Sequence, residues 1–271
     1  MQNKLFLDPV DISKALRTIG EKKATAGLFE LFIFAVLAGI YIAFGANVAT
    51  AVLSGGTLDG GLAKFLSGSV FSVGLMLVLI PGSELFTGNI LMTIGFIYRR
   101  YSLMKVLRNW LVVYLGNLAG AIFIAWLTYK SGLLGHLGDF TNTGKVAVSI
   151  AETKMGLGFI EALSRGILCN MLVCLAVIMC IASRTVTGKI FGIYFPIMAF
   201  VASGFEHSAA NMYFLPVGLM AKGEFMSSFA AMFDNLIPVT IGNVIGGLLI
   251  VLLHPKVEAK IARTLIGGGD K

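Results

Sequence analysis

The sequence predicts an all-α membrane protein whose six transmembrane helices form two inverted repeats of three, with the second and fifth helices broken. Composition, six long apolar runs and recurring motifs support this prediction. Of the 271 residues, 57% are hydrophobic and only 13% are charged, against about 25% charged in an average globular domain. Because a soluble domain of this length could not bury so much apolar surface, we expect the chain to lie in a lipid bilayer.

The N-terminal residues combine apolar and basic side chains in a helical pattern. Ile12, Leu16 and Ile19 share one helical face, next to basic residues and after Pro9. This pattern predicts a short amphipathic helix that lies on the cytoplasmic surface of the membrane.

Six apolar runs follow, and each reaches the length of about 20 residues that a helix needs to cross the hydrocarbon core. They are Ala26–Leu53, Phe65–Tyr98, Val106–Tyr129, Met155–Ser183, Ile190–Ala221 and Phe225–His254. The chain therefore divides into an N-terminal helix, a first repeat, a periplasmic or extracellular linker, a second repeat and a cytoplasmic tail. The expected boundaries are 1–25, 26–129, 130–154, 155–254 and 255–271.

Lysine and arginine are unevenly shared between the two sides that six crossings define. Fifteen lie with the termini on one side and five lie on the other. Because basic loops stay in the cytoplasm, this bias predicts cytoplasmic termini and a multi-pass protein of the plasma (inner) membrane.

Proline and glycine interrupt the second and fifth runs. Pro81 and Gly82 break the second run, and Gly204 breaks the fifth. Backbone groups freed by such breaks must face protein or a wet cavity. Paired breaks in corresponding segments of two halves indicate a binding site or pore near the middle of the membrane.

Two motifs recur in order across the two halves. Gly-x-Glu-x4-Asn occupies 82–89 and 204–211, and Asn-x6-Gly-Asn-x2-Gly occupies 109–120 and 235–246. Repeats of three spans enter the membrane in opposite directions, so this recurrence predicts an inverted repeat. The glycines four residues apart in the second motif predict close helix packing.

Acidic side chains lie next to both breaks. We expect Glu84 and Glu206 to accept hydrogen bonds from backbone N–H groups freed there and, with Asn89 and Asn211, to support the loops. Direct contact with substrate is the alternative.

His207 is the only histidine in the interior of an expected span, since His254 ends the sixth, and its counterpart in the first repeat is the apolar Leu85. The repeat is therefore asymmetric at a group that exchanges protons near neutral pH. Thr87 lies at the equivalent break and is expected to hydrogen-bond His207 or a passing ion. A buried histidine with a purely structural role is the alternative.

Several classes of protein are not supported by the motifs present. The chain has no nucleotide-binding P-loop, no HExxH and no GxSxG pattern, so we do not expect an enzyme. The spacing of Cys169, Cys174 and Cys180 favours neither a metal site nor a disulfide. The basic residues form no stripe with interleaved aromatics, so nucleic acid is not an expected partner, and no cofactor is expected.

Three segments together resemble the formate/nitrite transporter family: 79–88, 202–212 and 235–247. The similarity extends over about residues 8–254. The resemblance implies an aquaporin-like fold, a homopentamer with one pore in each protomer, and passage of small monovalent anions such as formate, nitrite or hydrosulfide.

The resemblance also implies roles for individual residues. It places Leu75 and Phe200 at a cytoplasmic constriction, and Phe86 and Val173 at a periplasmic one. The pore centre would hold His207, Thr87 and Asn170, and Lys154 would attract anions at the outer mouth. The segment around Thr87 would be mobile, and the N-terminal helix near Lys22 would be able to cap the inner mouth.

A bare anion crosses apolar constrictions at high cost, whereas a neutral acid crosses easily. We therefore expect a pH-dependent channel in which His207 holds or supplies a proton. A channel for neutral solutes of the aquaporin type is the alternative, although its paired Asn-Pro-Ala turns are missing. A membrane scaffold without transport would leave His207 and the matched breaks unexplained.

Overall fold

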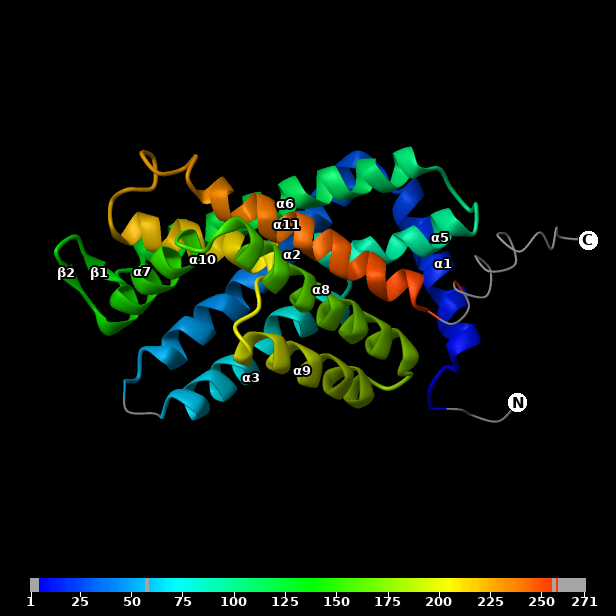
Figure 1. Cartoon of the computed structure of the whole chain (residues 1–271), viewed down its shortest axis with the longest axis horizontal. Helices are drawn as coiled ribbons and strands as arrows, with labels where there is room; N and C mark the ends of the chain where they lie inside the picture. The colour runs from blue at the N-terminus through cyan, green and yellow to red at the C-terminus, as the bar shows by residue number, and fades with distance from the viewer. Residues whose placement is uncertain (1–4, 57–58, 255–256, 258–271) are drawn as a thin grey trace, which may run out of the picture.

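The computed structural model describes residues 5–56, 59–254 and 257. It is almost entirely helical, and Figure 1 shows most of the helices running along the long axis, with α1 crossing it at one end. The elements are α1 (Pro9–Thr25), α2 (Leu28–Leu53), α3 (Gly60–Leu79), α4 (Phe86–Asn89), η1 (Ile90–Met92), α5 (Thr93–Ile97), α6 (Leu103–Lys130), β1 (Gly135–His136), β2 (Asp139–Phe140), α7 (Asn142–Met155), α8 (Phe159–Ala182), α9 (Val186–Ala202), α10 (Ser208–Ala221) and α11 (Met232–Leu252). Except for Val257, the expected tail 255–271 lies outside the described residues.

The six expected spans are present as helices, and the second and fifth are broken. Among the described residues, five helices are long and apolar enough to cross a membrane: α2, α3, α6, α8 and α11. Residues 80–85 separate α3 from α4, and residues 203–207 separate α9 from α10. The breaks therefore fall where proline and glycine predicted them.

The sixth span begins later than expected, because residues 225–231 form turns and α11 begins at Met232. Ser228 donates its N–H to the carbonyl oxygen of Glu224 (2.9 Å), and Ser227 donates its hydroxyl to the same atom (3.0 Å). Serine hydroxyls compete with helical hydrogen bonds in this way. The apolar composition of this segment therefore did not make it helical.

α1 forms as predicted, but its apolar face does not lie on lipid. Ile12 and Leu16 are buried against Leu91 and Ile94 of the second span. Asp8 caps the helix by accepting the N–H groups of Val10 and Asp11. The expectation of a helix on the membrane surface is wrong for this face, because the protein itself supplies the apolar partner.

The expected linker 130–154 is structured. A short hairpin, β1–β2, leads into α7, whose first turn is capped by Thr141 Oγ1. Thr143 at the start of α7 hydrogen-bonds Ser54 at the end of α2 (3.1 Å). Figure 1 shows the hairpin and α7 at one end of the long axis, and α1 and α5 at the other.

The two repeats pack in the same way. α6 lies against α2, and α11 lies against α8. A Cβ atom added at Gly120 would meet the carbonyl oxygen of Val36 at 2.1 Å, and one added at Gly246 would meet that of Ile167 at 2.2 Å. The glycine pairs therefore permit close helix contact, as the sequence predicted.

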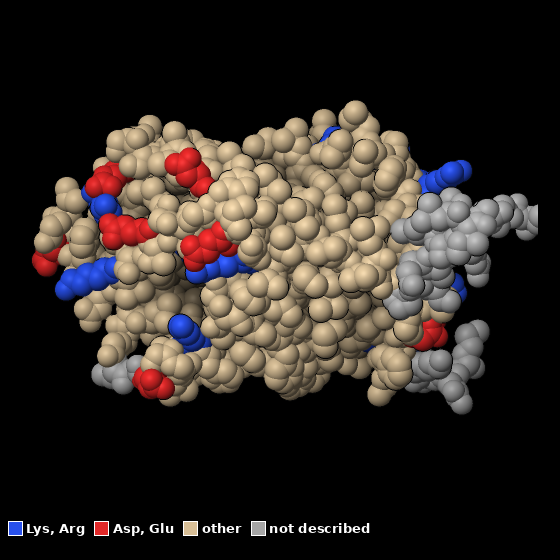
Figure 2. All heavy atoms as spheres, in the orientation of Figure 1, with Lys and Arg blue, Asp and Glu red and all other residues tan. Residues whose placement is uncertain are grey.

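Charged side chains are unevenly distributed over the surface. Figure 2 shows lysine, arginine, aspartate and glutamate near the two ends of the long axis, with a broad band of other residues between them. Many large apolar side chains are exposed, including Phe29, Leu111 and Phe195. A multi-pass membrane protein has such an apolar belt, because lipid covers it.

Candidate functional site

Each broken span is interrupted at a glycine and then continues toward the other end of the molecule (Figure 1). Gly82 and Gly204 have φ values of +94° and +72°, a conformation that L-residues adopt only with strain. A short extended segment follows each glycine, and a new helix, α4 or α10, then begins. α4 and α10 contact each other, so the two half-helices begin close together inside the protein.

Two equivalent asparagines hold these interrupted segments. Asn117 Oδ1 accepts the N–H of Phe86 (2.9 Å), and its Nδ2 donates to the carbonyl oxygens of Ala35 (2.8 Å) and Glu84 (2.9 Å). Asn117 is fully buried. The bonds to Phe86 and Glu84 satisfy backbone groups that the break would otherwise leave unpaired in an apolar interior, and the bond to Ala35 ties this segment to α2.

Asn243 makes the same three bonds in the second repeat. Its Oδ1 accepts the N–H of Ser208 (2.9 Å), and its Nδ2 donates to the carbonyl oxygens of Gly166 (2.8 Å) and Glu206 (3.0 Å). Glu206 and Ser208 flank His207, so Asn243 fixes the backbone on both sides of the histidine.

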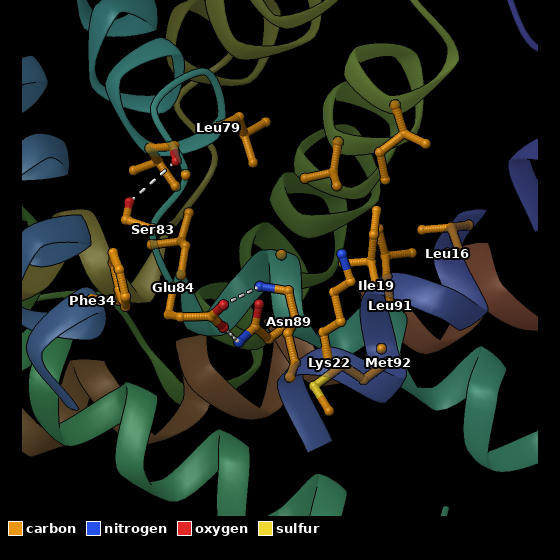
Figure 3. A pocket seen from close by; sticks show the side chains of 18 of the residues that line it. Leu16, Ile19, Lys22, Phe34, Leu79, Ser83, Glu84, Asn89, Leu91 and Met92 are labelled. Carbon is orange, nitrogen blue, oxygen red and sulfur yellow. Dashed lines mark hydrogen bonds and ion pairs between the residues drawn. The ribbon is translucent and has the colours of Figure 1, made fainter. Parts of the chain in front are cut away.

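Glu84 lies in a polar network with a lysine. Its Oε1 atom is 2.7 Å from Lys23 Nζ, and its Oε2 atom accepts from Asn89 Nδ2 (2.6 Å). Asn89 Nδ2 also donates to Asn109 Oδ1 (2.8 Å). Figure 3 shows Glu84 and Asn89 facing each other at the wall of a pocket.

Glu206 repeats this arrangement with a second lysine. Its Oε1 atom is 2.8 Å from Lys154 Nζ, and its Oε2 atom accepts from Asn211 Nδ2 (2.6 Å). Asn211 Nδ2 donates to Asn235 Oδ1 (2.7 Å), and Asn235 Nδ2 donates to the carbonyl oxygen of Lys154 (2.8 Å). The loop-support role expected for the acidic residues therefore has a geometric basis, but the donors are lysine and asparagine side chains. The freed N–H groups of Phe86 and Ser208 go to Asn117 and Asn243 instead.

His207 and Thr87 meet between the two half-helices. Thr87 Oγ1 is 2.8 Å from His207 Nε2, and both residues are buried. His207 Nδ1 accepts the N–H of Ala210 (3.2 Å), so the imidazole caps α10. A nitrogen that accepts from a backbone N–H carries no proton, and this bond therefore assigns the ring proton to Nε2, which donates to Thr87.

Asn170 lies next to this pair. Its Nδ2 donates to the carbonyl oxygens of Thr87 (3.3 Å) and Asn243 (2.6 Å). Its Oδ1 and the hydroxyl of Ser208 are buried and have no hydrogen-bond partner among the described residues. Unsatisfied buried oxygens are uncommon in folded proteins, and they add polar character to the centre.

Two pockets open on opposite sides of this centre. The first has a volume of about 460 Å³ and is lined by residues of α1 together with Glu84 and Leu85; we call it the Lys23 mouth. Figure 3 shows Lys22 and Leu16 of α1 on its wall, facing Leu79 and Ser83. The second, the Lys154 mouth, has a volume of about 170 Å³ and is lined by Lys154, Glu206 and His207.

The structure corrects one of the expected constriction residues. Phe200 lines the Lys154 mouth together with Lys154 itself, and its ring centroid is 5.7 Å from that of His207. It cannot therefore lie at the mouth opposite Lys154, as the resemblance implied. Phe86 is buried and its ring packs against Tyr114 (5.1 Å) and Trp110 (6.2 Å), and Leu75 and Val173 are buried in the core. The roles of these three residues at constrictions stay predictions.

Two residues near the pore were not singled out from the sequence. Phe71 lines the Lys154 mouth and packs edge-on against Phe200 at 5.6 Å. Lys23 is the counterpart of Lys154: the two lie 131 residues apart, as do Glu30 and Glu161, which lie near the starts of the first and fourth spans. A comparison of the residues seven positions before these two glutamates would have found the lysine. For Phe71, the sequence held no comparable signal.

Comparisons with known proteins agree with this architecture. Residues 10–256 match the formate/nitrite transporter family. The chain is 44% identical to a probable formate transporter of Methanothermobacter thermautotrophicus, with 91% of this chain and 94% of the relative covered. It is 37% identical to the formate channel FocA of Escherichia coli K12, with 91% and 92% covered. This chain belongs to the formate/nitrite transporter family.

Solved structures support the same fold. An ion channel of this family superposes with a TM-score of 0.81 at 29% identity, covering 89% of this chain and 96% of the other. A pentameric formate channel with formate bound superposes with a TM-score of 0.72 at 33% identity, covering 90% and 98%. The aquaglyceroporin of Plasmodium falciparum is similar in fold (TM-score 0.55, 16% identity, 86% and 100% covered). The fold is therefore aquaporin-like, as expected.

Proposed function

We propose that this protein is a channel that conducts small monovalent anions of weak acids, formate above all, with nitrite and hydrosulfide as further candidates. The observation that carries the proposal is the position of His207 and Thr87 between two mouths that each contain lysine. Its relatives act as formate channels or transporters. We propose no enzymatic reaction for this site.

The imidazole of His207 lies where it can determine whether the substrate crosses as an anion or as a neutral acid. Phe71, Phe200 and Leu85 present apolar surface on the two sides of the centre, where an unpaired anion is costly. His207 Nε2–H donates to the anion in place of Thr87 Oγ1. Transfer of a whole proton requires the ring first to take up a second proton at Nδ1 from water in a mouth, which breaks the bond from Ala210. The imidazolium then gives its Nε2 proton to the anion, which crosses as the neutral acid. The acid returns this proton to Nε2 on the far side, and Nδ1 releases the proton that it took up to water.

Polar atoms at the centre assist this passage. Asn170 Oδ1 and the Ser208 hydroxyl are without partners in the described structure, so they are available to a protonated substrate. A carboxylic acid has one O–H donor, which either oxygen accepts. The segment around Thr87 is the mobile element in this proposal, and α1, with Lys22, caps the mouth that it lines.

The protein is proposed to sit in the plasma membrane as a homopentamer with both termini in the cytoplasm. The Lys23 mouth then faces the cytoplasm and the Lys154 mouth faces outward. Support comes from the bias of basic residues and from the pentameric state of a similar formate channel. α1 and the end of α11 lie at the same end of the molecule (Figure 1), which agrees with an even number of crossings.

Transport by purified protein in liposomes tests the proposal. Wild type should accelerate formate uptake, with an initial rate that changes with pH. His207→Ala should remove the pH dependence, because the imidazole that exchanges protons near neutral pH is then absent from the centre. Glycerol uptake serves as the control for a neutral-solute channel. Unchanged formate flux and pH profile in His207→Ala, or glycerol flux without formate flux, would overturn the proposal.

A further inference from the structure

The lysine expected to attract anions at the Lys154 mouth is already neutralised. Lys154 Nζ is 2.8 Å from Glu206 Oε1, and the two side chains are only 14% and 4% exposed. Lys154 Nζ also lies 5.3 Å from the ring centroid of Phe214. A buried, closely paired lysine and glutamate together carry no net charge, so their field at the entrance falls off rapidly.

A second lysine lines the same mouth without such a partner. Lys64, on the first turns of α3, is exposed and lines the pocket with Lys154 and His207. Within the described part of the chain, no ion pair is recorded for Lys64, and Asp59 at the start of α3 does not reach it. The charged groups of this mouth are therefore two lysines and one glutamate, which leaves one positive charge.

We propose that Lys64, rather than Lys154, supplies the electrostatic attraction that draws substrate anions into this mouth. The inference rests on the proposed anion conduction and names a residue for its first step. Lys154 is instead a positioning residue, which holds Glu206 and thereby the loop that carries His207.

The Lys23 mouth also has a net charge of one positive unit, to which other residues contribute. Lys23 is paired with Glu84, while Lys22 and Lys189 also line that pocket, beside Glu30. Three lysines against two glutamates again leave one positive charge. A paired lysine thus supports the loop at each mouth, and additional lysines provide the net charge.

If Lys64 attracts substrate anions, the rate of formate uptake should depend on the salt concentration. A single exposed charge raises the local concentration of counter-ions in a cleft, and added salt screens it because the Debye length falls from about 30 Å at 0.01 M to about 6 Å at 0.3 M. A structural ion pair has no such signature, because the defect that follows its loss persists at every salt concentration.

The experiment compares four variants in liposomes with one sidedness, verified by protease access to an N-terminal tag. Initial formate uptake from the Lys154 side is measured at low and high ionic strength. Lys64→Gln should lower uptake about three-fold at low salt and match wild type at high salt. Lys64→Arg should keep the wild-type profile. Lys145→Gln, which removes an exposed lysine of α7 outside the pocket, is the matched control.

The fourth variant, Lys154→Gln/Glu206→Gln, removes both paired charges and should keep the wild-type ratio of low-salt to high-salt uptake. A Lys64→Gln protein with the wild-type salt profile would overturn the inference, and so would an equal loss in Lys145→Gln. Absence of formate flux in the wild type would instead refute the proposed function, so the two failures are distinguishable.

Discussion

The two repeats share their polar scaffold and differ at the centre. Asn117 and Asn243 make the same three bonds, and Glu84 and Glu206 each pair with one lysine and one asparagine. A feature that both halves keep serves the fold that both halves share. The duplicated carboxylates and asparagines therefore support the two loops at the breaks.

The residues that meet at the centre have no polar counterpart in the other repeat. His207 corresponds to Leu85, Thr87 to Ala209 and Asn170 to Gly39. Each repeat thus contributes polar groups that the other lacks. Departures from local regularity concentrate at functional positions, so the comparison assigns structure to the matched residues and chemistry to the unmatched ones.

The supporting helices differ as well. α7 delivers Lys154 and is joined to its surroundings at both ends, through the hairpin and through Lys222, whose Nζ is 3.1 Å from Glu152 Oε1. Its last turn leads directly into α8. α1 delivers Lys23, and the chain before it pairs with the α8–α9 turn through a single bridge, Phe6 with Ser183. α1 itself is held by side chains, including Arg108, which donates to the carbonyl oxygen of Ala24, and by the burial of Ile12 and Leu16.

Alanine at the two matched asparagines should produce the largest effects and should do so equally. Asn117→Ala and Asn243→Ala each leave two buried backbone groups of a break unpaired and remove a third bond to a neighbouring helix, at a cost of about 4 kcal/mol in unfolding free energy. Thermal unfolding of both variants in detergent measures the loss. Gln at the same positions serves as the control for size. If only one alanine variant were destabilised, the two networks would not be equivalent.

Removal of the two paired lysines should have unequal effects. Lys154→Gln leaves the carboxylate of Glu206, which is 4% exposed, without its cationic partner and should lower the free energy of unfolding by about 3 kcal/mol. Lys23→Gln leaves the carboxylate of Glu84, which is 17% exposed, without its cationic partner and should lower the free energy of unfolding by about 1 kcal/mol. Denaturation in detergent provides the measurement. Adding Glu206→Gln to the first variant should recover most of the loss, and a failure to recover would show that the ion pair is not its cause.

Much of the scaffold could be predicted from the sequence because its signals are local. Pro81, Gly82 and Gly204 mark the breaks, and the spacing of glycine, glutamate and asparagine marks the repeat. The pairing of His207 with Thr87 followed from their equivalent places beside the breaks. α7 was missed because its mixed composition resembles a surface linker.

The constrictions could not be predicted in the same way. Whether Phe86 or Phe200 faces the pore depends on the rotation of a helix and on its neighbours, Tyr114 and Trp110 in the first case. The pairing of Lys154 with Glu206 could not be predicted from the sequence either, since 52 residues separate them. Such contacts are set by tertiary packing, which the apolar pattern of a membrane helix specifies weakly because lipid accepts almost any apolar face.

The smallest effect expected here tests the asymmetric centre itself. Thr87→Val preserves shape but removes the acceptor of His207 Nε2–H, and one hydrogen bond of about 1 kcal/mol corresponds to about a five-fold change in rate. Formate flux should fall by about that factor, with a changed pH profile and little change in thermal stability. Thr87→Ser should retain both flux and profile, since it keeps the hydroxyl. Because Ala209 occupies the matching position in the other repeat, Ala209→Ser supplies the matched control and should not alter the pH profile. A valine variant that loses stability but keeps its pH profile would place Thr87 among the supporting residues.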